Sequence, residues 1–592
     1  MQQHEGSVRG NLMSTERRPD GRVVSEKLDR LRAATRALRL HLDSLPIDYR
    51  LGDAPERFLA GLAVASARQR YDCAESFIGA GFGGMAAGAL ARGLLVDALR
   101  WTWIAASPGR SRRLLADLLA ERSRLCELVD SVDADAPTLP RWLQPLPSLA
   151  GLTGFGQRWE ELSPIPGDDE LLSDFLSSRL VSAAGETPEP SLARVLALLA
   201  GAELKGATMV LAHAGHGNYL GLLSTVGEGG APGFDLREDH EALFLQAAAT
   251  GVVGVVVGAS LAPGNWWPGE VDRGPFIETA LTLGEAVSEA AVAVHGLIGK
   301  SGEQTSAAAT ERAHPPGVTH PRATVRPQDV WPDVVDVEEV WTEASKFFDL
   351  VQQFEVELWT DPPQPFHIVL SYGSAVSSLQ SVLGSRDRVA AEIIAPHVAR
   401  LMLEEAARTT WRYANPDPAV FERQAVQYFD EYRARKKRTI DQLAGRGVKR
   451  SAAEAFFELP SYVNVSQATT TITPGRQKLP DVASMVRHMS HDLSGNEWME
   501  LAYSLLSQVT HTTPLGLLHS VRFERGQLKI GETSREMTAL SLDVLCLAGT
   551  RILSTAGFLL RDLDEPSKEW RNTLMRQAAV VHALARMAHG LD

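Results

Sequence analysis

Cysteine is scarce in this sequence. The 592 residues include only Cys73, Cys126 and Cys546, which are widely separated and form neither a metal-type nor a redox-type pair. They fit reduced thiols in a cytosolic protein better than a disulfide framework. An excess of basic charge is also missing, and the net charge of −14 argues against a protein that coats nucleic acid. Residues 1–20 contain no apolar segment of the signal-peptide type, so we expect a cytoplasmic protein.

Strand patterns are missing as well. No stretch shows sustained alternation of apolar and polar residues between turn signals. Apolar residues recur instead at helical spacing, as Leu28, Leu31, Leu38 and Leu42 do in residues 25–45. A hydrophobic content of 44% with 22% charged residues is ordinary for globular proteins. The sequence therefore predicts an all-α protein.

One stretch of sequence occurs twice. Residues 91–108 read ARGLLVDALRWTWIAASP, and residues 399–416, 308 positions later, read ARLMLEEAARTTWRYANP. Nine of these eighteen positions are identical, where chance would give about one, and such repeats indicate duplicated structural units.

Two shorter repeated sequences follow in the same order. His216 opens HGNYLGLL and His511 opens HTTPLGLL, and the sequence His-Gly-Leu occurs at residues 295–297 and 589–591. The conserved order predicts two tandem homologous helical bundles that pack as a pseudo-dimer within one chain.

Composition sets the expected boundaries of these bundles. We expect a disordered tail at residues 1–24, a first bundle at 25–298 and a second bundle at 333–592. Residues 299–332 are rich in Pro, Thr and Ala without apolar periodicity, which indicates a linker.

Residues 242–262 resemble a membrane span, because these 21 residues carry no charge. The matching residues 539–560 contain Asp543 and Arg551, and charges in the middle of a span are costly in lipid. We therefore expect two buried bundle helices and no membrane association.

The repeated arginines, Arg92 and Arg400, are the first candidate functional residues. On a helical wheel Arg92 lies on the apolar stripe with Leu95, Leu99 and Trp103, so we expect it to be buried. A buried guanidinium must be paired or must hold an anion. The arginines are then either structural ties between helices or phosphate contacts.

The repeated acids and histidines are the next candidate functional residues. Asp97 and Glu405 each precede an arginine by three residues, a spacing that favours salt bridges on a helix surface. His216 and His511 each precede a Leu-Gly-Leu-Leu run, where a histidine is either a hydrogen-bonded core residue or a general acid–base group. The histidines at 295 and 589 lie near helix ends, where we expect them to interact with the helix dipole.

Metal and nucleic-acid sites have weaker signals. Histidine pairs at 213/216 and 488/491 have metal-like spacing but do not align between the copies, so we expect no metal and no cofactor. Five basic residues form a dense run in this acidic protein: Arg433, Arg435, Lys436, Lys437 and Arg438. This run is either a solvated helix face or a set of phosphate contacts for RNA or DNA.

The second copy resembles a known type of bacterial protein. A helix with a central arginine and acid, followed by a segment such as YSLLSQVTH at residues 503–511, is similar to an uncharacterised group allied to the HEPN superfamily. That resemblance implies helical bundles, many of which are metal-independent ribonucleases in toxin–antitoxin, abortive-infection and antiphage systems, while others are not catalytic. The HEPN ribonuclease signature is an arginine and a histidine on one helix with four to six residues between them. In neither copy does such a pair lie in the repeated motif; Arg576 and His582 have a fitting spacing, but the first copy has no counterpart of them.

Three functions remain open at this point. The first is an RNA-directed effector, a metal-independent ribonuclease, in bacterial stress or antiphage defence, whose partners are RNA and a protein from the same operon. In it Arg400 would hold a phosphate, Glu405 would orient the site and His511 would transfer a proton. The equivalent residues of the first copy are Arg92, Asp97 and His216. The second is a non-enzymatic binding or scaffold protein with structural arginines, and the third is a small-molecule or metal enzyme.

Overall fold

The fold was analysed in a computed structural model. It describes residues 25–47, 55–80, 84–106, 110–132, 165, 171, 190–199, 210–211, 236–262, 266–297, 337–353, 366–385, 387–415, 417–458, 479–492, 498–524, 527–530, 532–560 and 565–590. The expected tail at 1–24, the expected linker at 299–332 and the candidate His216 lie outside the described residues.

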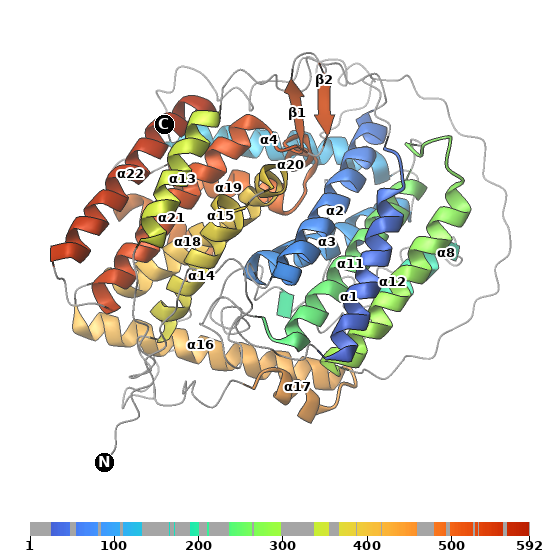
Figure 1. The fold of residues 1–592 in the computed structure, drawn as a ribbon, viewed down its shortest axis with the longest axis horizontal. Coiled ribbons are helices and arrows are strands. Elements are labelled where there is room, and N and C mark those ends of the chain that lie inside the picture. Colours follow the sequence, from blue (N-terminus) through green and yellow to red (C-terminus); the bar gives the residue numbers. More distant parts are fainter. Residues whose placement is uncertain are drawn as a thin grey trace.

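The described residues form two groups of helices that lie side by side (Figure 1). The first group consists of α1 (Glu26–Asp43), α2 (Pro55–Ala80), α3 (Gly84–Ala105), the short 3₁₀ helix η1 (Arg110–Arg112), α4 (Arg113–Val132), α8 (Pro190–Leu199), α11 (Glu238–Leu261) and α12 (Arg273–His295). The second group consists of α13 (Glu338–Gln352), α14 (Phe366–Leu383), α15 (Arg388–Tyr413), α16 (Pro418–Gly445), α17 (Arg450–Phe456), α18 (Val482–Asp492), α19 (Trp498–Thr510), α20 (Pro514–Leu518), α21 (Arg535–Leu560) and α22 (Glu565–His589).

The predicted all-α class is confirmed, with one small addition. Strands β1 (Val521–Glu524) and β2 (Gln527–Ile530) pair antiparallel, with Val521 opposite Ile530. Each strand is only four residues long, so neither could give a sustained alternating pattern in the sequence.

One long apolar helix lies at the centre of each group. α11 packs against α2, α3 and α12, and α21 packs against α14, α15 and α22. Both helices are long and apolar enough to cross a membrane, but 100% of the apolar window of α11 and 78% of that of α21 are buried inside the protein. The predicted burial of both segments is therefore confirmed.

Small residues allow α11 to approach α3 closely. Gly251, Gly254 and Gly258 lie on the face of α11 that contacts α3. A Cβ at position 251 would lie 2.6 Å from the carbonyl carbon of Leu94, and one at position 258 would lie 2.7 Å from that of Trp101. These glycines bring the two helix backbones together, so they fix the position of α3 and its polar residues.

Each group of helices also contributes a segment that packs against the other group. α4 packs against α19 and α20, and Gln508 on α19 donates a hydrogen bond to Glu121 on α4 (2.8 Å). In return, α16 runs along the lower edge of the molecule and leads to α17 beneath the first group (Figure 1). There Phe456 stacks on His240 at the start of α11, with ring centroids 4.2 Å apart. The two groups are thus joined through reciprocal contacts.

Glycines end the last helix of each group. Gly296 (φ 68°) follows α12 and Gly590 (φ 67°) follows α22, both in the left-handed conformation that glycine adopts without strain. The repeated His-Gly-Leu sequence therefore contains a helix C-cap in each half.

Candidate functional site

Arg400 on α15 meets the end of α19, which lies 110 residues further along the chain. The side chain is buried, as predicted, with 5% exposed surface. Its Nη1 donates to Thr510 Oγ1 (2.9 Å), and its Nη2 lies 3.2 Å from Glu404 Oε1. The guanidinium also lies over the Tyr503 ring, 5.6 Å from the centroid, a cation–π geometry. Arg400 is thus held in one orientation by both helices.

One face of α19 completes this site. Tyr503, Ser507 and His511 follow each other at intervals of four residues, so they share a face, and all three are half-buried. The Tyr503 hydroxyl donates to Glu404 Oε1 (3.4 Å). Burial, reinforced by the charge of Glu404, raises the pKa of Tyr503. The site therefore combines a buried guanidinium with hydroxyl and imidazole groups that solvent partly reaches.

The acid that contacts Arg400 is Glu404, whereas Glu405, the residue expected to orient the site, has other neighbours. Glu405 accepts a hydrogen bond from the Ser371 hydroxyl and lies 3.5 Å from His367 Nε2, both on α14. On a helix, position i+5 lies about 140° from position i, whereas position i+4 lies only about 40° away. The arginine and Glu405 therefore face different neighbours.

Asp97 on α3 lies in a buried ion cluster. Its carboxylate pairs with Arg70 Nη2 (2.5 Å) and Arg100 Nη1 (3.2 Å). The expected Asp97–Arg100 pair is therefore present but is not at the surface. Burial raises the pKa of Asp97, although both arginines act in the opposite direction.

The pair that the sequence repeat aligns with it, Glu405 and Arg408 on α15, is also buried. Arg408 Nη1 lies 3.8 Å from Glu405, and Arg408 Nη2 donates to Glu404 (3.0 Å). The prediction of surface salt bridges was thus wrong for both pairs, because α3 and α15 are covered on nearly all sides by other helices.

The turn after α19 connects the two clusters. Arg100 donates to the carbonyl oxygens of His511 and Thr512, and the Thr512 hydroxyl donates to Asp97. Thr512 has φ 41°, an unfavourable conformation for a β-branched residue. We name this region, Arg70, Asp97 and Arg100 of the first half with Arg400 and residues 510–512 of the second, the seam. Arg92, which aligns with Arg400 in the repeated sequence, is buried as predicted, with 8% exposed surface.

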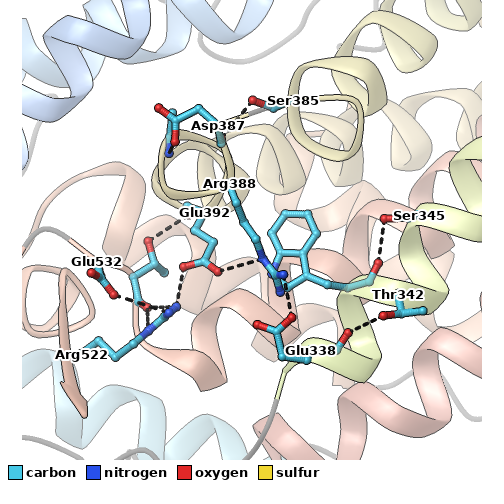
Figure 2. A network of polar contacts seen from close by, with 12 residues as sticks. Glu338, Thr342, Ser345, Ser385, Asp387, Arg388, Glu392, Arg522 and Glu532 are labelled. Carbon is cyan, nitrogen blue, oxygen red and sulfur yellow. Dashed lines mark hydrogen bonds and ion pairs between the residues drawn. The ribbon is translucent and has the colours of Figure 1, made fainter. Parts of the chain in front are cut away.

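A salt-bridge network fixes the chain that follows the seam. Figure 2 shows Glu392 of α15 between Arg388 and Arg522, with Arg388 also contacting Glu338 of α13 (2.7 Å). Arg522 on β1 donates to Glu392 and to the Thr533 carbonyl oxygen (2.8 Å). This network therefore holds β1 against α15.

His295 is part of a buried polar group and does not serve the helix dipole. Its Nδ1 accepts from the Leu297 amide (3.1 Å), so its Nε2 carries the proton and donates to Gln246 Oε1 (3.0 Å). Gln246 in turn donates to Ser288 (2.8 Å). Burial lowers the pKa of His295 to about 4, so this histidine is neutral at pH 7.

The second group of helices contains a related polar group around Asp543. Asp543, aligned with Gln246, accepts from His582 Nδ1 (2.8 Å) and His589 Nε2 (3.0 Å) through one carboxylate oxygen. The Trp498 ring stacks on both imidazoles, at 5.3 and 5.8 Å between centroids. Sequence reasoning missed this group, although Asp543 in an apolar helix was the available signal.

This arrangement separates the residues with HEPN-like spacing. His582 faces Asp543, whereas Arg576 is exposed and donates to Thr573 on its own helix (3.2 Å). The two side chains lie about 120° apart on the helix. They do not form a joint site here.

The basic run lies on α16, and much of its charge is compensated locally. Three of its members pair with acids on the same helix: Arg433 with Asp430 (3.6 Å), Arg435 with Glu431, and Lys437 with Asp441 (2.6 Å). Lys436 is half-buried and donates to the Phe457 carbonyl oxygen (2.7 Å), and burial lowers its pKa. Arg438 is exposed. This geometry resembles a solvated helix face more than a phosphate-binding surface.

Within the described ranges, no group of three or more His, Cys, Asp or Glu side chains is placed to hold a metal ion. The chain matches no protein-family model, no curated protein and no solved structure.

Proposed function

We propose that the chain consists of two copies of one helical domain that pack as a pseudo-dimer. Three observations support this. The central helices α11 and α21 pack with corresponding neighbours, and each half contributes a segment that packs against the other. The polar group at Gln246, Ser288 and His295 also corresponds to the group at Asp543, His582 and His589. Gln246 and Asp543, Ser288 and His582, and His295 and His589 are separated by 294 to 297 residues. The shorter repeated sequences have similar separations.

We further propose that the protein is an RNA-directed effector whose site is in the second copy. The observation that carries this proposal is the meeting of Arg400 with Thr510 and the half-buried face that ends at His511. A cation beside hydroxyl and imidazole groups suits a phosphodiester, and the resemblance to HEPN proteins points to RNA. A cytoplasmic role in bacterial stress or antiphage defence follows from the same resemblance.

The site suits cleavage without a metal. His511 would take the proton of a ribose 2′-hydroxyl, whose oxygen then attacks the adjacent phosphorus. Arg400 would stabilise the negative charge on the phosphoryl oxygens. The bond from phosphorus to the 5′-oxygen breaks, the 5′-oxygen takes a proton from water, and a 2′,3′-cyclic phosphate remains. Glu404 and Tyr503 would keep Arg400 in place.

RNA binding tests the first part of this proposal. We expect binding of single-stranded RNA to weaken in Arg400→Gln, with the slope of log K against log salt reduced by about 0.7. Glu405→Gln is the matched control, because it is equally buried on the same helix but faces α14. Arg433→Gln tests the basic run separately. Equal RNA binding by folded Arg400→Gln and wild type would rule out Arg400 as the phosphate contact.

A non-enzymatic binding protein is the second candidate. It is favoured by the buried pairing of Arg100 with Asp97 and of Arg408 with Glu404, since arginines of this kind can be purely structural. In that case wild type binds no RNA, and the Arg400→Gln and Glu405→Gln variants lose stability to a similar extent.

A further inference from the structure

Arg70 on α2 has an unused donor group that is buried in the seam. The residue is 1% exposed, its Nη2 pairs with Asp97, and its Nε donates to the Ser66 carbonyl oxygen (3.3 Å). Its Nη1 has no hydrogen-bond partner among the residues that the structure describes. A buried guanidinium nitrogen without a partner is unfavourable, so a ligand that accepts this hydrogen bond would be stabilised here.

Gly93 lets this nitrogen reach the second copy. A Cβ at position 93 would lie 3.2 Å from Arg70 Nη1 and 3.3 Å from the Thr510 carbonyl oxygen. The aligned residue of the second copy is Leu401, whose side chain would not fit at that point. The glycine therefore brings α2, α3 and the end of α19 together beside Arg70.

His397 faces the same region from α15. It is 3% exposed and lies one helical turn before Arg400. Burial, followed by the charges of Arg70, Arg400 and His511, lowers the pKa of His397 well below its ordinary value. The groups that act on His397 electrostatically are therefore all basic.

The acids of the seam are already shared between cations. Asp97 pairs with both Arg70 and Arg100, and Glu404 pairs with both Arg400 and Arg408. Arg408 also lies near Glu405, so three carboxylates face these four guanidiniums, and an anion would balance the remaining positive charge.

We propose that the seam binds a single phosphate group, held by Arg70, His397, Arg400 and His511. The first copy then completes the site of the second by contributing Arg70. This inference rests on the proposed function and narrows it, because the depth of Arg70 and His397 suits a terminal or inorganic phosphate better than a continuous chain. Bound phosphate also favours the protonated form of His397.

Thermal unfolding in inorganic phosphate, compared with chloride at equal ionic strength, tests the site. We expect phosphate to stabilise wild type and to bind His397→Gln and Arg70→Gln at least tenfold more weakly. His519→Gln is the control for His397→Gln, since His519 is fully buried in the same half and bonds to Ser534 (2.9 Å). Arg32→Gln is the control for Arg70→Gln, because Arg32 also pairs with an acid, Glu241, but lies outside the seam.

Calorimetry in two buffers of different ionisation enthalpy adds a second readout. Phosphate binding should take up fewer protons, or release more, in His397→Gln than in wild type, because bound phosphate favours protonated His397. Absence of phosphate stabilisation in wild type, or equal stabilisation and proton uptake in folded His397→Gln, overturns the site.

RNA substrates separate this inference from the proposed function. Tighter binding of RNA with a 5′-phosphate than with a 5′-hydroxyl supports the site and identifies an RNA end as its source. Phosphate binding without any RNA binding supports the site with free phosphate as its source and overturns the RNA function. RNA cleavage that is identical in wild type and His397→Gln, with no effect of phosphate, overturns the site and leaves the RNA function intact.

Discussion

Replacing Asp97 by asparagine should destabilise the protein strongly. Asp97 is the carboxylate of two buried guanidiniums, and the side chains of Arg70 and Arg100 are only 2% and 6% exposed. Removing one partner of a buried ion pair costs about 3–5 kcal/mol, because the remaining charge stays buried. A domain is stable by roughly 5–15 kcal/mol in total, so the loss is a large part of it.

The matched control is Asp430→Asn. Asp430 pairs with Arg433 at 3.6 Å, and these side chains are 34% and 42% exposed. An exposed pair of this kind contributes about 0–1 kcal/mol. The two variants therefore differ in burial while the chemical change is the same.

Urea denaturation followed by circular dichroism measures the difference. Native-state hydrogen exchange adds a local readout. Arg100 and Thr512 connect the turn after α19 to Asp97, so the amides at residues 510–513 should exchange faster in Asp97→Asn only. A loss below about 1 kcal/mol in Asp97→Asn, or equal losses in both variants, would refute the account of the seam as a buried ion cluster.

Three further predictions follow from the fold. Gly251→Ala should cost about 1–3 kcal/mol or more, because its Cβ would lie 2.6 Å from the Leu94 carbonyl carbon; Gly274→Ala, whose Cβ meets only Asp272 at 3.7 Å, should change stability by less than about 0.5 kcal/mol in the same urea assay. Because burial lowers the pKa of His295 to about 4, the unfolded chain binds a proton below pH 6.5 that the folded protein does not. Stability should therefore fall by up to about 3 kcal/mol between pH 6.5 and 4, and His295→Gln should reduce that slope; an identical pH profile would contradict the neutral histidine. Full-length protein should be recovered without detergent, and recovery only in the membrane fraction would show that the burial of residues 242–262 was misjudged.

Local patterns in the sequence were sufficient to predict the helices. The heptad-like spacing of Leu28, Leu31, Leu38 and Leu42 predicted α1, and all four leucines are buried. The hairpin was missed because pairing over four residues depends on the Arg522 network with α15, which is a contact between distant segments.

The candidate site was only partly predictable, for a related reason. Arg400 and His511 were chosen because they occur in repeated sequences, and the structure places Arg400 against Thr510. Glu404 replaced Glu405 as its acid because helix geometry decides which of two adjacent acids faces the arginine. Arg70 was missed because it lies outside every repeat. Its guanidinium reaches Asp97 only because α2 packs beside α3.

The most direct test of the RNA-directed site is the rate of RNA cleavage by wild type and by His511→Gln in the presence of EDTA. The account predicts that wild type cleaves single-stranded RNA without a metal and leaves 2′,3′-cyclic phosphate ends. It also predicts that folded His511→Gln binds RNA normally but cleaves it at least about 100-fold more slowly, as expected for loss of a general base. Equal cleavage rates, or no cleavage by folded wild type, would contradict the account.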